Sequence, residues 1–399
     1  MEYEKQITRM KNLYDNLYQF INDENNFEED FHTLINNIKS EKYFENIDEF
    51  KSILHIINKI SKNHHRYSAF LPKIEKVLLF YSDEIKKSFS NSELFNIFQS
   101  NKIVLLFLIE NKIVIIDDYV INSIINKDSK FKQFYVQYFE SQYQDEFVKK
   151  TKKSIEKQKL IHKNYSYYFY PEIKQFLDES KRNEIENKIP TIDENFENDR
   201  KSGENDLYIC QIIRQDLIDE FVIYENKNIL PLSIKIKPSI FETNPFLMKN
   251  EPTLIEYAAF YGSIQIFRYL LLNHVELSKM LWLYAIHGNN PEIIHILEEN
   301  RVKPDDNSYL ECLKESLKCH HNEIANYIID NLMEQKFEKN QNDFFENKVA
   351  FGFKYHNYIY IQNFYNYQSI FYYACLYDYL SIVKLLAKLR KINFNEDVI

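Results

Sequence analysis

Apolar residues recur at the spacing of an α-helix along the first part of the chain. Residues 95–98 and 103–107 show this period, and the run 103–109 is apolar on nearly all sides. A buried parallel strand would produce a similar run, but the scarcity of glycine around it favours a buried helix. We therefore predict a helical N-terminal domain over residues 1–170.

The nine prolines divide the rest of the chain. None occurs between Pro72 and Pro171, and none follows Pro304. Because proline interrupts helices, residues 73–170 can form long helices, whereas shorter helices are expected between residues 190 and 304.

Charge separates the two halves of the chain. Residues 149–163 are rich in lysine, and residues 192–206 are rich in acidic side chains. A segment with many charges has little apolar surface to bury, so we predict a charged linker over residues 171–206. A lysine-rich segment is typical of a solvated helix face. Nucleic-acid binding through residues 149–163 is the alternative, and the net charge of −9 weighs against it.

Four segments in the C-terminal part of the chain superpose on one pattern. Each segment has a small residue, and an isoleucine follows it eight positions later. From one segment to the next, the small residues are 27, 31 and 58 positions apart. The small residues are Ala258, Ala285, Ser316 and Ala374, and the isoleucines are Ile266, Ile293, Ile324 and Ile382. A small residue lets two helices approach closely. The turns that follow are at Gly262, Asn289, His320 and Asp378, where glycine or asparagine tolerates the positive φ that ends a helix.

These segments resemble the ankyrin repeat. Residues 253–262 match its consensus at Thr253, Ala258, Ala259 and Gly262, but lack its proline and its histidine. Thr253 and Glu256 also form a predicted capping box. Residues 203–206, 238–245, 252–262 and 283–294 give the wider chain a resemblance to a large protist family of ankyrin proteins, which carry a domain of unknown function with the repeats. This resemblance implies a binding scaffold and supplies no catalytic residue.

Residues 251–399 are accordingly predicted to be an ankyrin-like helical-repeat solenoid, with irregularities. The wide last spacing leaves two interpretations of residues 331–368, which hold either one degenerate repeat or an insertion. Residues 207–250 contain a possible degenerate repeat and a loop. The stretch 206–224 has the helical pattern there but lacks the small residue.

The composition supports an all-α fold and weighs against an enzyme. Only 4 glycines occur in 399 residues, whereas tight hairpins, phosphate loops and dinucleotide-binding turns all need them. The chain has no G-x-S-x-G, H-E-x-x-H or C-x-x-C motif. We therefore predict neither catalytic residues nor a cofactor.

One cluster has the chemistry of metal ligands: Cys312, Cys319, His320 and His321. It falls on a predicted repeat turn, where the ankyrin consensus has a histidine of its own, so we favour packing and predict no metal site. Four cysteines are too few for a disulfide framework. No signal peptide and no apolar run of membrane-spanning length is visible, so we expect an intracellular, cytoplasmic protein.

In the ankyrin geometry, the residues just after the small residue face a concave groove. The protein-binding candidates are therefore Phe260, Tyr261, His287, Lys318, Leu376 and Tyr377. Exposed aromatic side chains there would be interface anchors, and packing between repeats is the alternative. The expected function is a non-enzymatic protein–protein interaction scaffold whose partner the sequence does not identify.

Overall fold

The structure, a computed structural model, describes residues 2–23, 27–67, 69–125, 165–305, 308–333, 341–361 and 366–388. Over these residues the regular secondary structure is helical, apart from one isolated bridge between Lys235 and Thr253. The all-α prediction is confirmed for this part of the chain. Within the same ranges, no helix combines the length and the apolar character that a membrane span requires.

The chain divides into two compact units that do not follow the predicted order of domains. The first unit contains Met1–Glu84 together with Ala258–Ile399, and the second contains Ile85–Tyr257. The N-terminal helices therefore share a unit with the C-terminal helices. Sequence patterns report local structure, and they carry little information about which distant helices pack together.

The first unit begins with four helices and a short 3-10 turn. These are α1 (Glu2–Asn22), α2 (Phe27–Ser40), η1 (Tyr43–Glu45), α3 (Ile47–Asn63) and α4 (Phe70–Phe80). Helix α1 packs against α2 and α4, and α3 packs against α4. Their buried sides are mostly leucine, isoleucine and aromatic residues, as amphipathic helices require.

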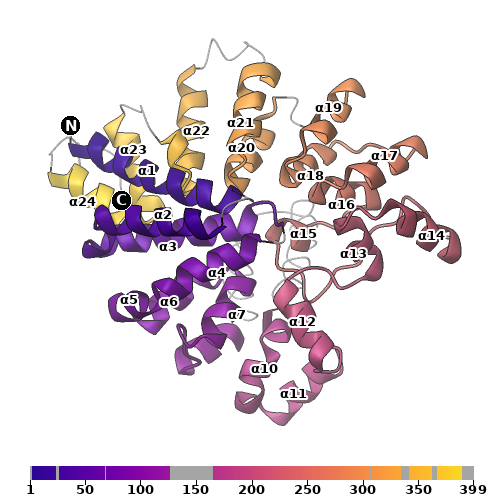
Figure 1. Ribbon diagram of the computed structural model, residues 1–399, viewed down its shortest axis with the longest axis horizontal. Helices are drawn as coiled ribbons and strands as arrows, with labels where there is room; N and C mark the ends of the chain where they lie inside the picture. Colours follow the sequence, from indigo (N-terminus) through magenta and orange to yellow (C-terminus); the bar gives the residue numbers. More distant parts are fainter. Residues whose placement is uncertain are drawn as a thin grey trace, which may run out of the picture. The chain divides into compact units, whose positions relative to one another are not determined.

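The C-terminal part of the first unit is a series of helix pairs, which Figure 1 shows in order from α16 to α24. The pairs are α16 (Leu254–Tyr261) with α17 (Ile264–Leu272), α18 (Leu281–Gly288) with α19 (Pro291–Glu299), α20 (Leu310–Cys319) with α21 (Asn322–Tyr327), and α23 (Tyr367–Leu376) with α24 (Leu380–Lys388). The π-helical turn η3 (Ile328–Leu332) extends α21. Between the last two pairs lie α22 (Gln341–Tyr355) and the 3-10 turn η5 (Tyr358–Tyr360). Helix α16 crosses the boundary between the units.

The first helices of successive pairs pack on one another. Helix α18 packs against α20, α20 against α22, and α22 against α23. The N-terminal helices join this series, because α3 packs against α20 and α24, and α1 packs against α24 and η5. Lys51 of α3 also forms an ion pair with Asp378, with 2.5 Å between Nζ and Oδ2.

The second unit is also helical. After α5 (Ser82–Ser88), which crosses the boundary, it contains α6 (Asn91–Phe98), α7 (Lys102–Glu110), α10 (Tyr170–Ile173), η2 (Lys174–Phe176), α11 (Glu179–Glu186), α12 (Glu194–Ser202), α13 (Tyr208–Arg214), α14 (Ile218–Asn228) and α15 (Pro245–Lys249). The apolar run 103–109 lies in α7, which confirms the predicted helix. The Asn101 side chain caps this helix by accepting a hydrogen bond from the backbone N–H of Val104.

The segment predicted as a charged linker, residues 171–206, holds helices with buried anchors. Phe196 and Arg200 of α12 are both buried. The Arg200 guanidinium lies 2.7 Å from a carboxylate oxygen of Glu172 and 2.7 Å from one of Glu197. The pattern of charges was misleading here because these charges pair with one another inside the unit. The lysine-rich segment 149–163 lies outside the described residues.

Candidate functional site

The predicted inter-helix turn occurs in all four helix pairs. Its central residue has a positive φ in each pair: 70° at Gly262, 49° at Asn289, 59° at His320 and 65° at Asp378. The small residue four positions earlier is fully buried in each case, at Ala258, Ala285, Ser316 and Ala374. Both features confirm the register in which the four segments were superposed.

Two glycines bring neighbouring pairs into backbone contact. A Cβ atom added to Gly288 would lie 2.0 Å from the carbonyl oxygen of Ala259, and one added to Gly262 would lie 2.8 Å from the carbonyl oxygen of Gly288. Real Cβ atoms do not approach so closely, so these positions need glycine. The close approach predicted at Gly262 is therefore confirmed.

The same turn appears in residues 331–368, where the sequence left two interpretations open. His356 has a φ of 56°, and the N–H of Asn357 donates to the carbonyl oxygen of Gly352 at 2.9 Å. This bond is equivalent to the one from His321 to Ser316, at 3.0 Å. Gly352 thus occupies the place of the small residue, and η5 stands where a second helix would begin. The same bond and a positive φ also end α7, α17 and α19, so this turn marks the end of a helix and leaves both interpretations of residues 331–368 open.

The possible earlier repeat also has this turn. Helices α13 and α14 are joined at Asp216, whose φ is 52°. The N–H of Leu217 donates to the carbonyl oxygen of Ile212 at 3.2 Å. Ile212 therefore occupies the place of the small residue, so the turn tolerates a larger side chain there.

The structure places the six predicted contact residues in different environments. Phe260 and His287 are buried, with ring centroids 4.7 Å apart; Tyr261, Lys318 and Tyr377 are half-buried; and Leu376 is 54% exposed. A buried side chain packs between helices and cannot contact a partner directly. The packing alternative therefore describes Phe260 and His287, whereas the other four candidates reach the surface.

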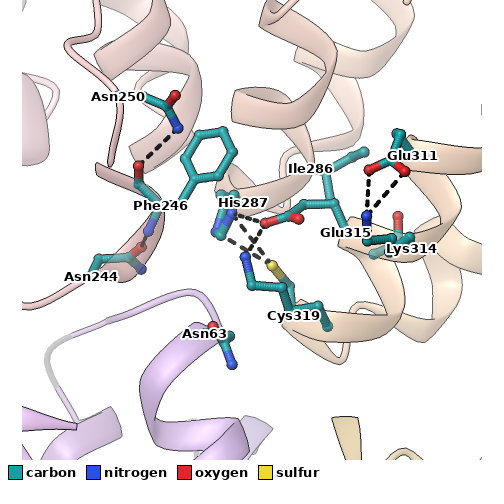
Figure 2. A network of polar contacts seen from close by, with 12 residues as sticks. Asn63, Asn244, Phe246, Asn250, Ile286, His287, Glu311, Lys314, Glu315 and Cys319 are labelled. Carbon is teal, nitrogen blue, oxygen red and sulfur yellow. Dashed lines mark hydrogen bonds and ion pairs between the residues drawn. The ribbon is translucent and has the colours of Figure 1, made fainter. Parts of the chain in front are cut away.

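His287 belongs to a cluster of polar side chains between α18 and α20, which we call the buried polar cluster: His287, Glu315, Lys318 and Cys319. Figure 2 shows His287, Glu315 and Cys319 pointing toward one another. The His287 Nε2 atom lies 2.7 Å from Glu315 Oε1, and the Cys319 Sγ atom lies 3.3 Å from His287 Nδ1. The Lys318 ammonium is 2.5 Å from the same Glu315 oxygen.

Helical spacing explains this arrangement. Glu315 and Cys319 are four positions apart on α20, which places them on one face of the helix. That face packs against α18, where His287 lies in the last turn. The sequence did not indicate that His287 would meet Glu315, Lys318 and Cys319, because these residues lie on two different helices. Comparing adjacent repeats in the same register would have brought them together.

Burial controls the charges in this cluster. It raises the pKa of the Cys319 thiol well above its usual range and lowers the pKa of His287, so both groups are neutral near pH 7. Burial alone would raise the pKa of Glu315, but the hydrogen bond from His287 and the charge of Lys318 outweigh it and hold that pKa at about 2. The cluster therefore contains one carboxylate and one ammonium, which balance.

The order thiol–imidazole–carboxylate is that of an activated cysteine nucleophile. Such a nucleophile needs a thiolate and access for a substrate. Cys319 is fully buried and its thiol is protonated. In this conformation the hydrogen bonds of His287 join α18 to α20, and the thiol lacks the charge and the access of an activated nucleophile.

The cysteine and histidine residues singled out from the sequence point to different partners. The His320 Nδ1 atom is 2.9 Å from the Tyr14 hydroxyl, whereas the His321 Nδ1 atom is 2.7 Å from the carbonyl oxygen of Ile286. Of the four, Cys319 alone belongs to a group whose ligand atoms lie together, and its companions are His287 and Glu315. Within the ranges that the structure describes, Cys312, Cys319, His320 and His321 do not gather their ligand atoms in one place.

Comparison of the chain with protein-family models, with curated proteins and with solved structures finds no match.

Proposed function

We propose that the protein is a non-enzymatic scaffold that binds another protein through ankyrin-like helix pairs. The observation that carries the proposal is the recurring turn, with a buried small residue followed four positions later by a positive φ. Stacked units of this kind bury their apolar faces against their neighbours, so the outward positions can vary without loss of the fold. Free cysteines suit an intracellular location.

The proposed contact surface is formed by the C-terminal ends of α16, α20 and α23, the first helices of their pairs. It includes Leu376, which is exposed, and Tyr261, Lys318 and Tyr377, which are half-buried. This set combines an apolar anchor with aromatic and charged side chains, which is the composition of an interface core with a polar edge.

A pair of matched variants tests this surface. The double variant Leu376→Ala with Tyr377→Ala should lose a protein partner that the full-length wild type captures from the organism's own cells. Ile223→Ala is the control, because Ile223 is also an exposed apolar residue, 66% accessible, but lies on α14. All three proteins should have similar thermal melts, and quantitative mass spectrometry measures the capture.

Two outcomes oppose the proposal. If no protein is enriched over a column without bait, or if the double variant and the control lose the partner equally, the surface is not the binding site. Capture that disappears after nuclease treatment, or falls steeply with salt, would instead support nucleic-acid binding through residues 149–163.

A further inference from the structure

We propose that His287, Glu315 and Cys319 bind one divalent metal ion of the zinc class. Their ligand atoms all lie within 4.8 Å of one another, and all three residues are buried. Nitrogen, sulfur and carboxylate oxygen are the donors that Zn²⁺ takes from proteins, whereas Mg²⁺ and Ca²⁺ prefer oxygen alone. Lys318, which pairs with Glu315, also belongs to the proposed contact surface, but the metal proposal does not rest on the protein-binding function.

The separation between the sulfur and nitrogen donors is close to that of a tetrahedral centre. Metal–ligand bonds of about 2.0–2.3 Å place nitrogen and sulfur ligands about 3.5 Å apart. The Cys319 Sγ atom and the His287 Nε2 atom are 3.7 Å apart. His287 Nε2 and Glu315 Oε1 are 2.7 Å apart, so the carboxylate has to move outward by about 0.6 Å to take its place as a ligand.

The scaffold holds these donors in place. Two of them lie one turn apart on α20, and the third lies in the last turn of the neighbouring α18. Three protein ligands leave one tetrahedral position for a water molecule. A metal ion there would join the first helices of two adjacent repeats, so it would stabilise the contact between them.

Lys318 is the group that competes with the ion. Its ammonium is 2.5 Å from Glu315 Oε1, where it supplies the positive charge that the metal would bring. The Lys318 side chain is 19% exposed and that of Glu315 is 12% exposed, so the cluster lies directly beneath the surface. Lys318 can rotate into solvent and open a path for the ion.

Binding would release one proton. The thiol of Cys319 loses its proton to solvent as the sulfur–metal bond forms, while the ring proton of His287 moves from Nε2 to Nδ1. The bound charge is then +2 from the metal, −1 from the thiolate and −1 from Glu315. Affinity should therefore rise with pH, by up to about tenfold per pH unit for the one proton released.

The test uses cobalt(II), whose bond to a thiolate gives a charge-transfer absorption. The full chain carries Cys375→Ser, because Cys375 is the exposed free cysteine and would bind cobalt by itself. We expect this absorption to saturate at one cobalt per chain and zinc to displace the cobalt. Metal should also raise the melting temperature, since a ligand that binds the folded state stabilises it.

Matched variants separate this site from other thiols and histidines. Cys319→Ser should abolish the absorption and His287→Gln should weaken binding at least about tenfold, whereas Cys312→Ser and His295→Gln should leave both unchanged. Cys312 is a buried cysteine on the same helix, and His295 lies 3.3 Å from Glu298 at the surface. Lys318→Met should strengthen binding several-fold, because it removes the competing cation.

The proposal is overturned if the Cys375→Ser protein, folded by circular dichroism, shows no thiolate absorption with excess cobalt. It is also overturned if the absorption survives Cys319→Ser, or if Lys318→Met weakens binding. The last two results would assign the metal to other residues and leave His287, Glu315 and Cys319 as a hydrogen-bonded packing cluster.

Discussion

Single residues set the helix ends throughout this protein, and only some of them were visible in the sequence. The turn positions Gly262 and Asn289 followed from residue type, because glycine and asparagine tolerate a positive φ. His320 and Asp378 followed only from their place in the repeat. The candidate site was partly predicted: His287 was identified as a contact residue, but its burial and its partners depend on the packing of α18 against α20.

A second recurring cap was missed. In the part of the chain that the structure describes, asparagine closes four helices by donating from its side chain to the carbonyl oxygen four residues earlier, at 2.7–2.9 Å. The residue after each asparagine has a positive φ of 49–58°. These asparagines are Asn111, Asn228, Asn273 and Asn300. In a chain rich in asparagine, such a signal is visible only once the ends of the helices are known.

Gly288 gives the sharpest prediction at this scale. Gly288→Ala places a methyl group 2.0 Å from the carbonyl oxygen of Ala259, so α16 and α18 must separate. We expect a loss of about 1–3 kcal/mol in the free energy of unfolding, measured by urea denaturation. Because alanine is otherwise the better helix residue, an unchanged or higher stability would show that the two helices do not meet there.

At the scale of elements, helices were easier to predict than their boundaries or their roles. The apolar run in α7 and the four helix pairs had strong periodic patterns. Helix α12 did not, because acidic residues such as Asp193, Glu194 and Glu197 suggested a solvated segment. The structure shows that Asp193 caps the helix by accepting from the N–H of Phe196, while Phe196 and Arg200 enter the core. Phe196 and the ion pairs of Arg200 with Glu172 and Glu197 thus anchor this short charged helix.

Arg200 tests whether α12 belongs to the folded unit. The positive charge of its guanidinium balances the negative charge of the Glu172 carboxylate. Burial raises the pKa of that carboxyl even with Arg200 beside it. Arg200→Ala should cost about 3–5 kcal/mol of unfolding free energy, because it leaves a buried carboxyl without its partner. Lys201→Ala is the neighbouring control: its exposed pair with Glu110 should contribute less than about 1 kcal/mol. If Arg200→Ala and Lys201→Ala lower the free energy of unfolding equally in urea denaturation, α12 is a linker and not part of the folded unit.

At the scale of the whole molecule, the pairing of residues 1–84 with residues 258–399 is the feature that the sequence could not predict. No local pattern says that α3 will pack against α20 and α24, or that α1 will pack against α24. The contact has a recognisable chemistry, because histidines gather in it. His64 of the N-terminal part is 2.8 Å from the carbonyl oxygen of Cys319, and the ring of His55 stacks on that of His356 with centroids 5.1 Å apart.

His356 makes this contact sensitive to pH. Its ring is buried between His55 and Tyr379, with Lys59 and His320 nearby, and burial lowers its pKa well below 6.5. The folded protein keeps His356 neutral, whereas the unfolded chain takes up a proton below about pH 6.5. The contribution of the neutral His356 to the free energy of unfolding is therefore fully present above about pH 6.5, and it falls as the pH drops below that value. His356 alone should contribute a loss of about 1 kcal/mol by pH 5.5.

The variant His356→Phe keeps an aromatic ring against Tyr379 but cannot titrate. Urea denaturation at pH 7.5 and pH 5.5 should show a smaller drop in unfolding free energy for this variant than for the wild type, by about 1 kcal/mol. His295→Phe removes an exposed imidazole and should behave as the wild type. Parallel losses in wild type and His356→Phe would show that His356 is not held neutral. The joining of the N-terminal helices to the repeats would then have to depend on its apolar contacts and on ion pairs such as Lys51 with Asp378.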